Sequence, residues 1–105
     1  MAWVNLLDQT IQIIEFHGHT LSDVKWVGNW DGDYSIEWDA FTKISDIEYN
    51  PGYGGVEIAL DLVVVGSDWW LERSGYDGSE WWNYKTLPVR RENAKPFHTV
   101  EGNIE

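Results

Sequence analysis

The stretch "SDWWLERSGYDGSEWWNYKTLP", residues 67–88, holds four of the chain's eight tryptophans, in two adjacent pairs on either side of "YDGS". Asp-Gly is the dipeptide that favours a two-residue type I′ loop, because both loop residues there need a positive φ. A loop made by Asp77 and Gly78 fixes the register of the two flanking strands. The pairs expected to lie opposite each other are Arg73 with Trp82 and Leu71 with Tyr84. The stretch therefore predicts a β-hairpin.

This register splits each tryptophan pair between the two faces of the hairpin, because successive side chains of a strand point to opposite sides. The face expected in the core carries Trp69, Leu71, Arg73, Trp82 and Tyr84. The other face mixes rings with polar groups, namely Trp70, Glu72, Ser74, Trp81, Asn83 and Lys85. Trp70 and Trp81 are then either covered by a helix or displayed. Arg73 either grips a ligand or is a buried structural arginine paired with Asp61 or Glu80, and we favour the structural interpretation.

The segments upstream predict two helices. "NLLDQTIQIIEFHG" has Asn5 as a cap, Asp8 in a capping-box position and Gly18 as a closing residue, although the alternation of "TIQI" also fits a strand. "WDAFTKISD" predicts a short helix capped by Asp39, with Phe41 and Ile44 facing inward.

The remaining segments predict strands and a loop. "DVKWVG" and "DYSIEW" form two strands joined by "NWDG", with Asp33, Ser35 and Glu37 on the outward face of the second. "EYNPGYGG" predicts a loop, and "VEIALDLVVV" a strand that ends as a central one. The fold class is therefore α+β, an antiparallel sheet of about five strands with an N-terminal helix and a second short helix, in the order α-β-β-α-β-β-β.

Length and composition predict a single domain. A chain of 105 residues with 43% hydrophobic residues can bury one core. We expect this domain to span residues 1–90, with residues 91–105 as a loosely ordered C-terminal tail beside the basic cluster Arg90, Arg91 and Lys95. The chain has no cysteine and no visible signal segment, and its longest apolar run is four residues, so we expect a cytoplasmic protein without a membrane span.

The charge is distributed unevenly along the chain. Residues 1–72 carry thirteen acids and two bases, whereas residues 73–105 carry five of each, so the first part carries the whole net charge of −11. Such a field repels nucleic acid and anionic lipid and attracts basic partners. The alternative is that the acids only keep an aromatic-rich domain soluble.

No pattern of residues predicts catalysis, a metal site or a cofactor. "HGH" at residues 17–19, with Asp23 nearby, lacks a third ligand at a suitable spacing and is better explained by a helix end. "DGDYSIEWDAFT" resembles a calcium loop, but Ile36 replaces the required Gly and Thr42 the required Glu. We therefore expect a protein that is not an enzyme.

The block "YDGSEWW", the longer "WWLERSGYDGSEWWNYKTLP" and the "GYGGVEIA" loop resemble a family of small, acidic, uncharacterised proteins. These are encoded by phages and prophages of Gram-positive bacteria. The resemblance runs from about Leu21 to Pro88. It implies a short protein made inside an infected cell, and it implies no activity.

Three functions are then compatible with the sequence. The first is a phage-encoded inhibitor or modulator that binds a basic surface of a host protein, of the nucleic-acid mimic, anti-CRISPR or anti-restriction type, through an acidic face of Asp31, Asp33, Glu37 and Asp39. The second is a carbohydrate-binding module that uses an aromatic face of Trp30, Trp70 and Trp81. The third is a structural protein that assembles as a homo-oligomer. Direct binding to nucleic acid or to a membrane is not expected.

Overall fold

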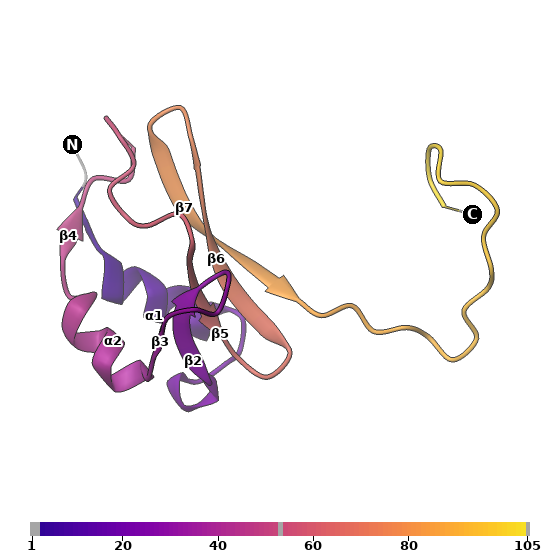
Figure 1. The fold of residues 1–105 in the computed structure, drawn as a ribbon, viewed down its shortest axis with the longest axis horizontal. Helices are drawn as coiled ribbons and strands as arrows, with labels where there is room; N and C mark the ends of the chain where they lie inside the picture. The colour runs from indigo at the N-terminus through magenta and orange to yellow at the C-terminus, as the bar shows by residue number, and fades with distance from the viewer. Residues whose placement is uncertain (1–2, 53, 105) are drawn as a thin grey trace.

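The computed structural model describes residues 3–52 and 54–104, and all structural statements below refer to them. In chain order the elements are β1 (Val4–Asn5), α1 (Leu6–Phe16), the 3-10 helix η1 (Leu21–Asp23), β2 (Trp26–Asn29), β3 (Ser35–Ile36), α2 (Trp38–Ile44), β4 (Glu48–Tyr49), β5 (Leu62–Val65), β6 (Trp69–Tyr76) and β7 (Ser79–Thr86) (Figure 1). In these residues the strands form a five-stranded antiparallel sheet, in the order β3-β2-β5-β6-β7, and a small sheet of β1 and β4. The α+β fold class is confirmed.

The aromatic hairpin has the predicted register. Asp77 and Gly78 form the loop with φ values of 52° and 84°, the positive angles that a type I′ turn requires. Across β6 and β7, Arg73 pairs with Trp82 and Leu71 with Tyr84, as expected. The local preference of Asp-Gly thus sets the alignment of two eight-residue strands.

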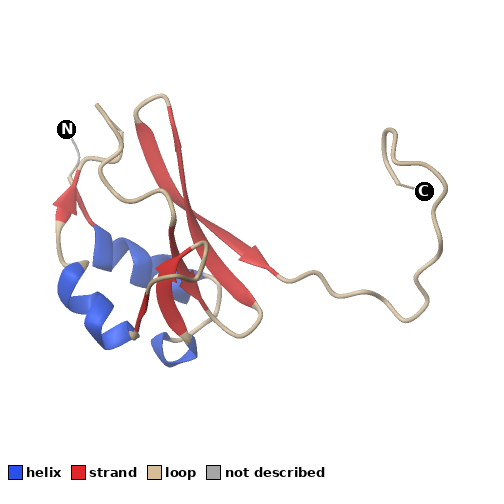
Figure 2. Ribbon diagram, viewed as in Figure 1, coloured by secondary structure: helices blue, strands red, loops and turns tan. Residues whose placement is uncertain are grey.

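The core lies between the helices and one face of the main sheet, which we call the inner face. Val27, Val64 and Leu71 lie in one row across three strands, and all are fully buried. Ile14 of α1 and Phe41 of α2 belong to the same buried cluster, so both helices cover this face (Figure 2). Each such side chain contributes about 1.5–3 kcal/mol by leaving water.

The N-terminal segment is a helix, which resolves the ambiguity of its pattern. The Asn5 side chain accepts a hydrogen bond from the backbone N–H of Asp8, at 3.0 Å, and caps the first turn. Gly18 follows the helix with a φ of 83°, as expected of a closing glycine. Asn5 also pairs with Glu48 between β1 and β4, so the predicted loop "EYNPGYGG" is wrong at its first two residues.

The region from β3 to α2 differs from the prediction. The second strand of the hairpin is only two residues long, because α2 begins at Trp38. Glu37 occupies the cap position without a side-chain bond, so the expected cap at Asp39 is wrong. Phe41 is buried as predicted, but Ile44 is 65% exposed, which corrects its inward assignment.

The predicted strand "VEIALDLVVV" forms only at its end. β5 covers Leu62–Val65 and lies in the middle of the sheet, so its central position is confirmed. Upstream of it, the backbone N–H groups of Glu57 and Ile58 donate to the Glu80 carboxylate, at 2.8 and 3.0 Å. The Glu80 side chain therefore takes the hydrogen bonds that a neighbouring strand would otherwise accept. Val56 and Leu60, which were expected on one face of a strand, are exposed.

The chain beyond β7 runs away from the body. Residues 87–104 contain no helix or strand, and all of them are exposed (Figure 1). The radius of gyration is 16.7 Å, whereas a compact chain of this length has about 13 Å. The last strand of the body, β7, ends at Thr86.

Candidate binding surface

The face of the main sheet opposite the helices, here called the outer face, is rich in tryptophan. Trp26 pairs with Val65, Val65 with Trp70, and Trp70 with Lys85, so these four residues form one row across four strands. They alternate along their strands with the buried residues of the inner face, so they project from the opposite side. The next row on this face is Gly28, Val63, Glu72 and Asn83.

Three rings on the outer face wall a hollow of about 250 Å³, which we call the tryptophan hollow. The walls are Trp26, Trp30 and Trp70, with Val63 and Val65 as the remaining lining. Trp30 is 51% exposed, whereas Val63 is only 2% exposed. The hollow is thus open to solvent and lined by apolar side chains.

Nearby residues in the same strands fix the positions of the Trp70 and Trp26 rings. Trp70 Nε1 donates a hydrogen bond to Glu72 Oε1, two residues along β6, at 2.8 Å. Trp26 leans over Gly28, since a Cβ at that position would come within 2.9 Å of the Trp26 ring. Because Gly28 has no side chain, the Trp26 ring can occupy the space above it.

The expected aromatic face is formed in part. Trp30 and Trp70 come together in the hollow, whereas Trp81 lies outside it, opposite Ser74 on the same side of the hairpin. Trp81 is 39% exposed and donates from Nε1 to Asn83 Oδ1, at 3.1 Å. Trp26, the third ring of the hollow, was not predicted from the sequence. The alternation of Trp26 with Val27 was a usable signal, but the pairing of β2 with β5 was needed to place it.

The predicted acidic residues are all exposed, but they fall into two groups. Asp31 and Asp33 lie in the turn between β2 and β3, directly after Trp30. Glu37 and Asp39 line a different hollow at the start of α2, together with Lys25. The continuous acidic face expected from strand alternation does not form, because β3 is too short to carry it.

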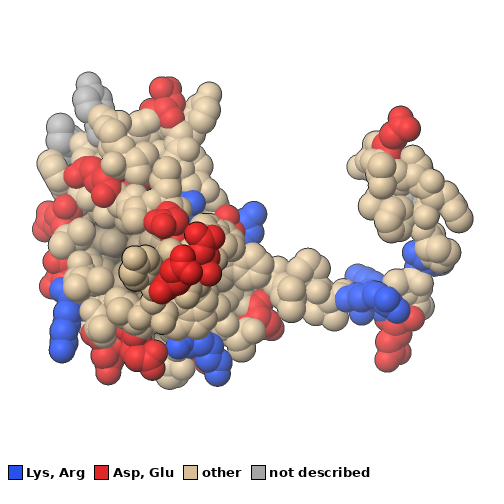
Figure 3. Space-filling model, in the orientation of Figure 1, with Lys and Arg blue, Asp and Glu red and all other residues tan. Residues whose placement is uncertain are grey.

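These carboxylates are not neutralised by nearby bases. In residues 3–52 and 54–104 the ion pairs are Arg73 with Glu80 and, if the histidine is protonated, His19 with Asp23. None involves the four predicted acids. In Figure 3 acidic side chains are spread over the visible face of the body with a few basic ones among them, and further basic side chains lie on the tail. The body therefore keeps its negative field.

Further acids border the tryptophan hollow. The backbone carbonyl of Asp61 accepts a hydrogen bond from the N–H of Trp30, at 3.0 Å, so this exposed acid adjoins Trp30 through the backbone. Glu72 is bonded to the Trp70 ring, and Asp31 follows Trp30 in the chain. The hollow is thus apolar inside and acidic along part of its rim.

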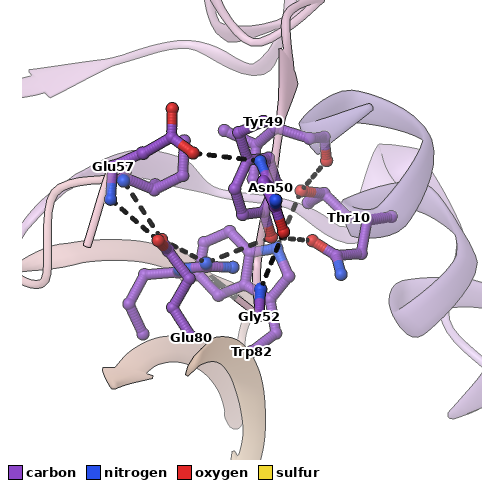
Figure 4. Close-up of polar contacts among 11 residues, drawn as sticks. Thr10, Tyr49, Asn50, Gly52, Glu57, Glu80 and Trp82 are labelled. Carbon is purple, nitrogen blue, oxygen red and sulfur yellow. Dashed lines mark hydrogen bonds and ion pairs between the residues drawn. The ribbon is translucent and has the colours of Figure 1, made fainter. Parts of the chain in front are cut away.

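Arg73 is a structural residue, as expected. Its Nη2 lies 3.0 Å from Glu80 Oε1, both side chains are fully buried, and the guanidinium lies 4.9 Å from the Trp82 ring centroid. The partner is Glu80 rather than Asp61. Figure 4 shows Glu80 beside the backbone of Glu57, and Tyr49 and Trp82 near the same centre. No solvent-facing part of Arg73 remains to grip a ligand.

The "HGH" motif packs against the hairpin. The His17 ring stacks on Tyr84 with centroids 3.7 Å apart, and the His19 ring stacks on Trp69 at 4.4 Å. His19 Nε2 also lies 2.7 Å from the Tyr84 hydroxyl. In the part of the chain that the structure describes, no three His, Asp or Glu side chains gather in a metal-binding group. The motif fastens the end of α1 to the sheet.

No protein-family model matches this chain, and the searches of curated proteins and of solved structures gave no match either. Among the residues described, none of the helices has the length and apolar character needed to cross a membrane.

Proposed function

We propose that the protein is a non-catalytic, phage-encoded acidic protein that binds a basic surface of a host protein and inhibits or modulates it. The partner we favour is a nucleic-acid-handling defence factor of the restriction or CRISPR type, met in the cytoplasm of the infected cell. Carboxylates of this protein would take the place that phosphates occupy on such a surface. Neither nucleic acid nor a membrane is part of the proposal.

One observation carries this proposal. Asp31 and Asp33 are exposed, form no ion pair in the described residues and closely follow Trp30 in the chain, and Trp30 is an exposed wall of the apolar hollow. Charge complementarity at an interface speeds encounter and selects the partner. Tryptophans that become buried when two proteins bind supply much of the binding affinity. Exposed acids in the turn that follows Trp30 and the exposed Trp30 ring itself can supply both contributions.

Carbohydrate binding is the second candidate. Trp81 is partly exposed, and its N–H is bonded to Asn83, so an aromatic ring and a polar group lie side by side on the outer face. Such a pair suits a sugar ring. However, Trp30 and Trp70 wall a hollow instead of continuing a flat platform with Trp81, which favours the protein partner.

Affinity capture from lysate of the natural host, followed by purified binding, tests the proposal. The variant is Asp31→Lys with Asp33→Lys. The control is Glu15→Lys with Glu92→Lys, which changes the net charge equally at exposed positions on α1 and the tail. We expect the wild type and the control to bind one basic protein directly, and the first variant to lose it. Equal binding by all three proteins would contradict an acidic interface at this turn.

A further inference from the structure

The size of the tryptophan hollow limits what it can hold. Pockets for drug-sized ligands have volumes of about 300–1,000 Å³. The hollow, at about 250 Å³, is smaller and open at the surface. It therefore suits one side chain of a partner better than an oligosaccharide or a cofactor.

The walls of the hollow favour a cation with an apolar stem. Trp26, Trp30 and Trp70 present three indoles around one space, and tryptophan is the aromatic side chain that attracts cations most strongly. Val63 and Val65 provide an apolar lining along which the methylene groups of a long basic side chain can lie. A carboxylate-bearing side chain would find no donor among these five lining side chains other than indole N–H groups, and that of Trp70 is already bonded to Glu72.

The acids near the hollow also favour a cationic ligand. Asp31 follows Trp30 in the chain, the Asp61 backbone carbonyl accepts from the Trp30 N–H, and the Glu72 carboxylate accepts from the Trp70 indole. The bases nearest in the pairing pattern are Lys25, which precedes Trp26, and Lys85, which faces Trp70. Acids therefore lie next to Trp30 and Trp70, the two bases lie next to Trp26 and Trp70, and no base adjoins Trp30 in the chain. A cation would enter from the Trp30 end.

We propose that the tryptophan hollow binds the guanidinium group of an arginine side chain on the partner protein, an inference that rests on the proposed function. Arginine fits better than lysine, because its planar, weakly hydrated guanidinium stacks on aromatic rings and binds carboxylates through two N–H groups. The rings take the two faces of the guanidinium, and Asp31 or Asp61 takes its N–H groups at the rim.

Titration of the ¹⁵N-labelled full chain with a short blocked peptide, Gly-Gly-Arg-Gly-Gly, tests this inference. The signals observed are the indole N–H resonances of the tryptophans. We expect those of Trp26, Trp30 and Trp70 to shift saturably in the millimolar range, about 4 kcal/mol of binding, while that of Trp81 stays still. The lysine peptide should bind several-fold more weakly, and the citrulline peptide, which has the same shape without the charge, should not bind.

Variants separate the hollow from its surroundings. Trp30→Leu should abolish the shifts of Trp26 and Trp70, and Trp81→Leu should leave them unchanged. Chemical denaturation confirms that each variant is folded, which the exposure of both rings leads us to expect. Absence of saturable shifts in the wild type, or equal binding of the arginine and citrulline peptides, would overturn the inference. Shifts centred on Trp81 with maltohexaose, and none with arginine, would also overturn it.

The two proposals fail in different ways. One outcome is that the captured partner no longer binds the Asp31→Lys, Asp33→Lys variant but still binds Trp30→Leu normally. This outcome would support the acidic interface and reject arginine binding in the tryptophan hollow. Specific arginine binding without any basic partner would support the hollow and reject the proposed function.

Discussion

Arg73 and Glu80 form an ion pair of 3.0 Å inside the core, and neither side chain reaches solvent. Glu80 also accepts from the backbone N–H groups of Glu57 and Ile58, and Arg73 donates to the Tyr49 hydroxyl, at 3.2 Å. Through these hydrogen bonds, β6 and β7 are connected to the irregular segment before β5 and to the short strand β4. Arg73 Nε and Nη1 are buried without a hydrogen-bond partner in the described residues, and Nη2 makes the bond to Glu80, which is therefore the main compensation for the buried charge.

Loss of one partner of this pair should be costly. Glu80→Gln leaves the Arg73 charge buried without a carboxylate, and we expect a loss of about 3–5 kcal/mol in the free energy of unfolding. The double variant Arg73→Met, Glu80→Leu should recover part of it, because no charge remains buried. Urea denaturation of Glu80→Gln and of the double variant measures both changes. A loss below about 1 kcal/mol for Glu80→Gln would show that the pair is not the centre of this network.

The tryptophans of the two hairpin faces should differ in their effect on stability. Trp82 is 7% exposed and donates from Nε1 to Thr10 Oγ1, at 3.0 Å, so Trp82→Ala should lose about 3–5 kcal/mol. Trp70 is only half-buried, and Trp70→Ala should lose roughly 1–2 kcal/mol. Denaturation curves measure both. Equal losses would mean that the outer face is as important to folding as the core.

Gly28 should not tolerate a side chain. A Cβ at this position would lie 2.0 Å from the Tyr34 carbonyl oxygen and 2.9 Å from the Trp26 ring. We expect Gly28→Ala to lose about 2–3 kcal/mol and to disturb the indole signal of Trp26. Gly55→Ala is the matched control, since a Cβ there meets nothing within 4 Å. An unchanged stability of Gly28→Ala would contradict the close approach of β2 to the turn before β3.

The tail should be dispensable for folding. Residues 87–104 are exposed and contain no helix or strand, so their removal exposes no core. We expect a chain that ends at residue 90 to unfold within about 0.5 kcal/mol of the full chain. Thermal or urea denaturation of both chains decides this. A large loss would show that the domain extends beyond the predicted boundary.

Local signals were sufficient for part of this fold. Asp77-Gly78 determines the hairpin, and the Asn5 cap with Gly18 marks the ends of α1. Contacts distant in sequence account for the rest. The strand predicted upstream of β5 is replaced by bonds to Glu80, 22 residues away for Ile58. No local pattern reveals such a competitor, nor the short pairing of β1 with β4.

The binding surface was predictable in composition but not in arrangement. Exposure of Asp31, Asp33 and Trp30 follows from their place in a turn. The meeting of Trp26 with Trp70 depends on Val65, which pairs with both. An isolated sequence gives the two strands but not their common neighbour, so the hollow could not be foreseen.

The salt dependence of binding to the captured host protein tests the central claim most directly. Wild type, Asp31→Lys with Asp33→Lys, and Glu15→Lys with Glu92→Lys are each titrated at low and at physiological salt. Exposed charges are screened over about 8 Å at physiological ionic strength, so wild-type affinity should fall as salt rises. The variant in the turn should bind at least about tenfold more weakly at low salt, which is 1.4 kcal/mol, and the control should follow the wild type. Salt-independent binding that is equal for all three proteins would contradict an acidic interface.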